Sequence, residues 1–202
     1  MVGRPRRAPG QFGILSAADL MPAYNSRPPG NVTTLASFTS PGLIVPQLRG
    51  RDSAAVIGEL GSRLQGEGRL NDPLSFYNAA MSREWLSSTA MAPGWALPHA
   101  RMKGLPQLAF ALGRSTEALN WPGAGGVAVR LVFLFAVPEA DGASYLTLIS
   151  GLAKLSRDPA RCQSLLQAPD PQAIFEVLQQ VPLAQLSSAP ARNQPESTYH
   201  TA

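Results

Sequence analysis

The sequence predicts an α/β fold in which helices cover both faces of a sheet, in the order β-α-α-β-β-β-α-α-α. Three observations support this fold class. Short runs of branched apolar residues indicate strands, and pairs of an N-capping residue and a proline mark the starts of helices. One strand candidate, Val129–Val137, is apolar on both of its alternating faces. Such a strand is buried from both sides, so the sheet is expected to lie between two layers of helices.

The first predicted strand is Gly42–Leu48, a short run rich in branched residues that ends near a proline. A helix is expected to follow it, with Asp52 or Ser53 as the N-cap. Apolar residues four apart give this helix a stripe that faces the core. The stripe consists of Val56, Leu60 and Leu64.

A second helix is predicted directly after the first. Asn71 or Asp72 serves as its N-cap, and Pro73 takes the first helical position. Proline is tolerated there because a backbone N–H at that position has no acceptor within the helix. Apolar residues again recur at helical spacing, which indicates a core-facing side. The predicted stripe consists of Leu74, Tyr77, Met81 and Trp85.

Three further strands are predicted at Trp95–His99, Gln107–Gly113 and Val129–Val137. The last of them belongs to the longest apolar run of the chain, Val127–Val137. This run contains Arg130 and is too short to span a bilayer as a helix. No transmembrane segment and no direct membrane insertion are therefore predicted.

Three helices are expected to complete the domain. The first has Ser144 as a candidate N-cap, and two shorter helices are expected to begin at Asp158 and Asp170, each of which precedes a proline. The first of these helices carries a long apolar stripe. Its members are Tyr145, Leu148, Ile149, Leu152 and Leu155.

Charge and composition predict one domain between two polar arms. The 202 residues carry a net charge of +4, but four arginines minus one aspartate give residues 1–35 a charge of +3, so the remaining 167 residues carry only +1. We expect a flexible basic Pro/Gly-rich arm at 1–35, a folded domain at 36–181 and a flexible polar tail at 182–202. A nucleic-acid-binding face on the folded part is not indicated.

The cysteine count and the N-terminal segment bear on the compartment. Cys162 is the single cysteine, which excludes an intramolecular disulfide and a cysteine-built metal site. The N-terminal segment is basic but lacks the continuous apolar core of a signal peptide, so no export signal is predicted. These features predict a cytoplasmic protein.

The segment MAPGWALPHARMKG, residues 91–104, holds His99, the one histidine outside the predicted tail. Imidazole titrates near neutral pH, and its neutral nitrogen is a nucleophile. A histidine at the end of a strand is also often a hydrogen-bonded structural residue. The Pro-His motif alone leaves both interpretations open.

Three side chains upstream of His99 favour phosphoryl chemistry. Arg83 offers a planar guanidinium that suits phosphate oxygens, and the hydroxyls of Ser88 and Thr89 can donate to an oxyanion or orient the imidazole ring. Phosphoryl transfer depends on positioning and charge neutralisation, so an arginine beside the histidine is the expected partner. The alternatives are an ion pair between Arg83 and Glu84 and turn or capping roles for the hydroxyls.

The runs SREWLSSTAMAPGWALPHAR and LVFLFAVPEADGASYLTLISGLAKLSRDPARCQSLLQA resemble the type 2 IIA domain of the bacterial phosphoenolpyruvate-dependent sugar phosphotransferase system. This family includes fructose and mannitol IIA components and a nitrogen-related regulator, and the resemblance covers about residues 35–181. It implies a three-layer α/β/α sandwich with a mixed β-sheet. It also implies that His99 accepts a phosphoryl group from the phosphocarrier HPr, that Arg83 is the active-site arginine, and that no metal or organic cofactor is needed.

The chain departs from the family pattern at Tyr145, where transport-active members usually carry a second histidine. A tyrosine hydroxyl can donate a hydrogen bond to a phosphoryl oxygen, but it cannot supply the charge of an imidazolium. The alternative is that Tyr145 only packs on the helix stripe. A second departure is the glycine-rich turn at 120–129, which is expected to connect two strands without chemistry.

Two functions from different classes follow from these residues. The first is a cytoplasmic phosphocarrier or regulatory IIA component that receives a phosphoryl group on His99 and passes it to a IIB partner or uses it as a signal toward a regulated protein. The second is a non-catalytic interaction module that keeps the fold with a degenerate site. Tyr145 favours the second function, whereas the retained Arg83 and His99 favour the first.

Overall fold

The computed structural model describes residues 33–183, which form an α/β domain. Most of the predicted basic arm and polar tail, including His200, lies outside these residues. The two ends of the described chain pair with each other. Thr34 and Pro182 form an antiparallel bridge, and Leu35 N donates to Val181 O at 3.1 Å. The chain therefore enters and leaves the domain at one place.

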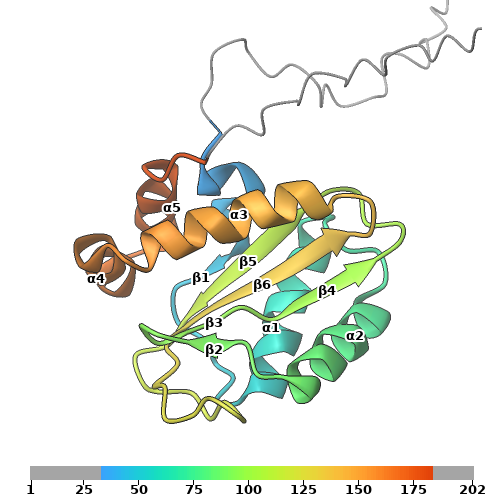
Figure 1. The fold of residues 1–202 in the computed structure, drawn as a ribbon, viewed down its shortest axis with the longest axis horizontal. Coiled ribbons are helices and arrows are strands. Elements are labelled where there is room, and N and C mark those ends of the chain that lie inside the picture. The colour runs from blue at the N-terminus through green and yellow to red at the C-terminus, as the bar shows by residue number, and fades with distance from the viewer. Residues whose placement is uncertain (1–32, 184–202) are drawn as a thin grey trace, which may run out of the picture. The chain divides into compact units, whose positions relative to one another are not determined.

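Six strands form one mixed sheet, which confirms the predicted fold class (Figure 1). They are β1 (Ile44–Val45), β2 (Ala90–Met91), β3 (Trp95–Ala96), β4 (His99–Met102), β5 (Ala109–Arg114) and β6 (Leu131–Pro138). The central strands β5 and β6 are antiparallel. β1 pairs with β5 in parallel, β3 and β4 pair with β6 in parallel, and β2 is antiparallel to β3. The histidine of the Pro-His motif begins β4.

Five α-helices flank the sheet within residues 33–183. They are α1 (Ser53–Gly66), α2 (Pro73–Leu86), α3 (Gly142–Leu155), α4 (Pro159–Gln167) and α5 (Pro171–Gln179). Two short 3-10 helices, Leu35–Phe38 and Pro41–Leu43, precede β1. No helix within residues 33–183 has the length and apolar character needed to cross a membrane.

Every α-helix starts directly after an aspartate that accepts a hydrogen bond from a backbone N–H three residues on. This confirms four predicted N-caps at Asp52, Asp72, Asp158 and Asp170. The predicted cap at Ser144 is wrong. α3 begins one turn earlier because the carboxylate of Asp141 accepts from Ser144 N at 3.3 Å.

The helices form two layers with the sheet between them, so the three-layer arrangement is confirmed (Figure 1). Phe133 and Phe135 of β6 face the side covered by α3, α4 and α5, whereas Val132 and Leu134 face α1 and α2. Each residue of β6 except the last is buried, as expected for a strand that is apolar on both faces. β6 thus contributes aromatic rings to one core and aliphatic side chains to the other.

The predicted core stripe of α2 is wrong at both of its ends. Leu74 is 70% exposed and Trp85 is 81% exposed. The buried residues of α2 are Phe76, Ala80 and Glu84, also four apart but rotated around the helix. Spacing alone allows both stripes. The structure buries the face on which the Glu84 carboxylate reaches hydrogen-bond donors.

The strand predicted at Trp95–His99 is two strands, β3 and β4. Both pair with β6 in one register, since Trp95 lies opposite Leu131 and His99 opposite Phe135. The ladder breaks between them because Pro98 has no N–H to donate. β2 was not predicted, because two residues are too few to show a period.

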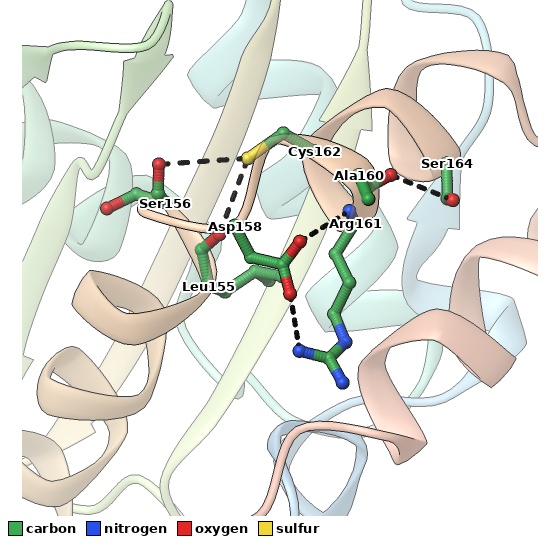
Figure 2. A network of polar contacts seen from close by, with 7 residues as sticks. All are labelled: Leu155, Ser156, Asp158, Ala160, Arg161, Cys162 and Ser164. Atoms are coloured by element: carbon green, nitrogen blue, oxygen red, sulfur yellow. Dashed lines mark hydrogen bonds and ion pairs between the residues drawn. The ribbon is translucent and has the colours of Figure 1, made fainter.

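The connection from α3 to α4 is closed by hydrogen bonds around the single cysteine (Figure 2). Cys162 Sγ contacts Leu155 O at 3.4 Å, and the Asp158 carboxylate accepts from Arg161 N at 3.0 Å. Burial raises the pKa of the Cys162 thiol, with a further contribution from Asp158. Cys162 is therefore a neutral core residue that joins two helices.

Candidate functional site

The candidate site lies at the start of β4, on the face of the sheet that α3 covers. Successive side chains of a strand point to opposite faces. Ala100 and Met102 pack into the core beneath α1 and α2, so His99 and Arg101 point toward the α3 side. The side chain of His99 is partly exposed. The Pro-His segment therefore delivers one imidazole to the surface at the sheet edge.

The imidazole of His99 is oriented by the backbone of the segment between β3 and β4. Its Nδ1 lies 3.3 Å from Leu97 O. A carbonyl oxygen only accepts, so this contact is a hydrogen bond when Nδ1 carries the proton, and Nε2 then keeps its lone pair. Nε2 has no hydrogen-bond partner among residues 33–183. In this tautomer Nε2 is the ring nitrogen that carries a lone pair.

The surroundings favour the neutral imidazole. Burial lowers the pKa of His99 below its ordinary 6.5, the hydrogen bond to Leu97 opposes this, and the charges of Arg83 and Arg101 lower the pKa further. Glu84 acts in the opposite direction. The neutral form therefore predominates at physiological pH, with Nε2 available as a nucleophile.

Tyr145 of α3 lies against the imidazole. The ring centroids of Tyr145 and His99 are 5.5 Å apart, and Tyr145 also meets Phe135 edge-on at 5.8 Å. Burial raises the pKa of Tyr145, although Arg83 and Arg101 lower it. The phenol is thus neutral at physiological pH. No hydrogen bond of its hydroxyl is found within the described range, so this residue both packs on the core and keeps a free donor.

Arg83 lies in the last turn of α2 and faces the same site. Its Nη1 donates to Ser87 O at 3.0 Å. The ion pairs of the described chain do not include Arg83, so the alternative of a salt bridge to Glu84 is not observed. Its charge nevertheless acts on both His99 and Tyr145. Most of its N–H donors remain available to a ligand.

Glu84 is the polar centre beneath the site, and its side chain is buried, with the residue only 6% exposed. One oxygen, Oε1, accepts from Trp121 Nε1 and Thr89 N, each at 2.7 Å, and from Ser88 Oγ at 3.2 Å. The other, Oε2, accepts from Thr89 Oγ1 at 2.6 Å. A buried carboxylate with this many donors is fully compensated and fixes the groups around it.

The same network reaches His99 through the backbone. Thr89 Oγ1, which donates to Glu84, also accepts from Leu97 N at 3.1 Å. Leu97 in turn presents its carbonyl to the imidazole. Ser88 and Thr89 thus both donate their hydroxyl protons to Glu84, and Thr89 also orients the ring through Leu97. Sequence reasoning placed both hydroxyls near the histidine but did not identify the carboxylate that holds them.

The glycine-rich connection at 120–129 contributes to the site in a way that its sequence did not indicate. Trp121 supplies the indole N–H to Glu84. Gly123 has φ +70°, and a Cβ placed on it would lie 2.9 Å from Ser88 Cβ. A glycine is required there because the turn passes directly against the loop that precedes β2. Trp121, Glu84 and Arg101 are the site residues that sequence reasoning missed.

Within residues 33–183, no three side chains of histidine, cysteine, aspartate or glutamate gather in a way that could hold a metal ion. The side chains around His99 comprise an oriented imidazole, the guanidinium groups of Arg83 and Arg101, and a phenol. This set is suited to a nucleophilic reaction with an anionic group such as a phosphoryl.

The chain is similar to proteins of known family. Among curated proteins, 30% identity over 133 residues links the chain to a fructose-specific EIIABC component of the phosphotransferase system from Bacillus subtilis. The match covers 66% of this chain but only 21% of that much longer protein. A nitrogen regulatory protein from Bradyrhizobium diazoefficiens is 28% identical over 71% of this chain and 94% of its own length.

Solved structures show the same fold. The nitrogen regulatory protein IIA-Ntr from Neisseria meningitidis superposes with a TM-score of 0.64 at 24% identity, over 71% of this chain and 98% of that one. A mannitol IIA enzyme from Escherichia coli, solved in complex with a phosphorylated IIB enzyme, superposes with a TM-score of 0.59 at 18% identity.

The family model that describes the type 2 EIIA domain of the phosphoenolpyruvate-dependent sugar phosphotransferase system matches residues 37–181. These residues hold the whole sheet, the five helices and the site around His99. The chain belongs to this EIIA type 2 family.

Proposed function

We propose that this protein is a phosphocarrier or regulatory IIA component that accepts a phosphoryl group on His99 Nε2 from an HPr-like phosphocarrier. The observation that carries the proposal is the orientation of the imidazole. Among residues 33–183, Nδ1 contacts Leu97 O, Nε2 has no hydrogen-bond partner, and Arg83, whose charge acts on His99, has no acidic partner. A structural histidine would be expected to satisfy both ring nitrogens.

The proposed reaction is an in-line transfer between two imidazoles. The lone pair of His99 Nε2 attacks phosphorus, a new N–P bond forms, and the N–P bond to the donor histidine breaks. The electron pair of the broken bond stays on the donor nitrogen. The reaction needs no metal and no organic cofactor, because the donor is itself a phosphoprotein.

The residues around His99 have separate roles in this proposal. Arg83 stabilises the negative charge on the phosphoryl oxygens with its free N–H donors. Tyr145 donates its hydroxyl to one of these oxygens. Ser88 and Thr89 act through Glu84 and Leu97, holding the imidazole in the reactive tautomer. Positioning and charge thus come from different elements, α2, α3 and the loop before β2.

The phosphoryl group then leaves for a IIB partner or remains as a signal to a regulated protein. The relatives support both outcomes, since one is a sugar-specific component and another a nitrogen regulator. The mannitol IIA structure in complex with a phosphorylated IIB enzyme supports the first. In either case the protein works in the cytoplasm, where phosphoenolpyruvate and the carriers are found.

A second function, an interaction module without phosphoryl transfer, is favoured by one observation. Tyr145 packs between His99 and Phe135, so it serves the core at the position where a second histidine is expected. A partner would then recognise the folded surface, and phosphorylation would be absent.

The experiment that distinguishes these functions is phosphorylation of the purified full-length chain. The chain is incubated with phosphoenolpyruvate, enzyme I and HPr, and the gain of one acid-labile phosphoryl group is read by intact mass. His99→Ala is the test variant. His200→Ala is the matched control, because it removes the other histidine of the chain.

The proposal predicts that wild type and His200→Ala gain the group and that His99→Ala does not. No gain in wild type, with a gain in Tyr145→His, supports the interaction module. A gain that persists in His99→Ala and disappears in His200→Ala contradicts both functions.

A further inference from the structure

Arg101 is a second arginine beside the candidate nucleophile. It lies two residues after His99 on β4, so both side chains leave the strand on the same face. Ala100 between them is buried on the opposite face. Arg101 itself is exposed. Two adjacent same-face positions on one strand thus carry the imidazole and a guanidinium.

The guanidinium of Arg101 rests against the first residue of α3. A Cβ placed on Gly142 would lie 2.7 Å from Arg101 Nη2. Any side chain at this position would displace the guanidinium, so the glycine leaves space for it. Tyr145 lies three residues further along α3, on the same side of the helix. Arg101 therefore lies where β4 and α3 meet, beside both rings of the site.

The guanidinium of Arg101 is unpaired in the part of the chain that the structure describes. Among residues 33–183 it takes part in no hydrogen bond and no ion pair of its side chain. The nearby cation Lys103, by contrast, pairs with Glu139 at 3.8 Å. The charge of Arg101 acts on His99 and on Tyr145, as the charge of Arg83 does. Two arginines that form no ion pair among residues 33–183, one from α2 and one from β4, thus act on one imidazole.

We propose that Arg101 is a second catalytic arginine, which binds phosphoryl oxygens on His99 from the α3 side and supplies the positive charge that Tyr145 lacks. This inference rests on the proposed phosphoryl transfer. Arg101 gains and loses no proton in the step. As the N–P bond to the donor breaks and the bond to His99 Nε2 forms, its N–H groups donate to the equatorial oxygens and stabilise their charge.

The test measures single-turnover transfer from phosphorylated HPr to the full chain at several HPr concentrations, so that the maximal rate is separated from donor affinity. The variants are Arg101→Ala, Arg101→Lys and the double variant Arg101→Ala with Tyr145→His. Arg130→Ala is the matched control. Arg130 is also exposed but precedes the opposite end of β6, about 20 Å along the strand direction.

The expected result is that Arg101→Ala lowers the maximal rate by about tenfold to a hundredfold. Arg101→Lys keeps the charge and loses less. In the double variant the new imidazole recovers part of the lost rate, and Arg130→Ala transfers like wild type. Circular dichroism and thermal melting are expected to be unchanged in Arg101→Ala, because this side chain is exposed.

An Arg101→Ala variant that transfers at the wild-type maximal rate overturns the inference and leaves the proposed function intact. A loss confined to donor affinity also overturns it, because Arg101 would then only dock the carrier. A double variant that transfers no faster than Arg101→Ala overturns the claim that Arg101 supplies the positive charge that Tyr145 lacks. A wild-type chain that accepts no phosphoryl group removes the proposed function, and the inference with it.

Discussion

Arg114 and Arg83 show two uses of the same side chain, one at the end of a strand and one at the end of a helix. Arg114, at the end of β5, donates to four backbone carbonyls at 2.7–3.1 Å. It thereby joins the end of β1 to the last turn of α4 and satisfies carbonyls that a helix end leaves unpaired. Arg83, in the last turn of α2, donates to one carbonyl of its own chain segment. The acceptors of Arg114 are Pro46, Leu165, Leu166 and Ala168.

This difference separates a structural arginine from one that is available to a ligand. A guanidinium with four internal acceptors contributes to stability and has little left to offer outside the protein. A guanidinium without an acidic partner, beside a half-buried imidazole, contributes little to stability. Substitution of the two residues should therefore change two different measurable quantities.

The largest effect is expected from Arg83→Ala on phosphoryl transfer. Removal of a charge-stabilising donor set is expected to slow transfer from phosphorylated HPr by about a hundredfold to a thousandfold. The free energy of unfolding should change by less than about 0.5 kcal/mol, because one exposed hydrogen bond is lost. Quenched-flow transfer assays measure the rate, and urea unfolding measures the free energy of unfolding. A large loss of stability with an unchanged transfer rate would show instead that Arg83 is a structural arginine.

Arg114→Met is expected to show the opposite pattern. Loss of four hydrogen bonds and the unpaired carbonyls left behind should lower the free energy of unfolding by about 2–4 kcal/mol. The transfer rate per folded molecule should stay at the wild-type value. Arg157→Met is the matched control, since Arg157 is exposed and only its backbone N–H is bonded. Equal stability of the two variants would contradict a structural role for Arg114.

A smaller effect is expected where the glycine-rich turn supports the site. Trp121→Phe removes the indole donor to Glu84 but leaves its other donors, Ser88 and Thr89. The free energy of unfolding should fall by about 1 kcal/mol, with a modest loss of transfer rate. Urea unfolding measures the first and the transfer assay the second. Trp85→Phe is the control, because this exposed indole has no such partner, and it should behave like wild type.

The smallest expected effect is the titration of His99. In a His200→Ala chain, nuclear magnetic resonance should give an imidazole pKa below 6.5, because burial lowers it and Arg83 and Arg101 add to the shift. The unfolded chain therefore binds its proton first as pH falls, so the folded domain loses stability from about pH 6.5 downward. Transfer should decline as pH falls through the lowered pKa. A pKa above 6.5 would mean that a negative charge dominates the site.

The sequence predicted those parts of the fold that depend on local chemistry. Four helix starts were predicted correctly because N-capping is a local interaction. The aspartate and the backbone N–H that it accepts from are only three residues apart. β2 and the break between β3 and β4 were missed, because two-residue strands show no period. The face of α2 was assigned wrongly because its direction depends on Glu84, whose indole partner lies 37 residues away.

The same limit applies to the candidate site. His99 and Arg83 were identified from residue types in one continuous segment and from the family resemblance. Trp121 and Arg101 were missed because their importance depends on contacts across the fold, one with α2 and one with α3. A tryptophan in a glycine-rich turn and an arginine on a short strand have no distinguishing pattern in sequence. Long-range contacts of this kind require coordinates.

The most direct test of the proposed phosphorylation of His99 identifies the nitrogen that carries the phosphoryl group. The full chain, with isotope-labelled histidine, is phosphorylated through HPr, and phosphorus–nitrogen coupling is observed by nuclear magnetic resonance. The proposed function predicts coupling to Nε2 of His99, with Nδ1 still bearing the proton that it donates to Leu97 O. Coupling to Nδ1, or a phosphoryl group on any residue other than His99, would contradict it.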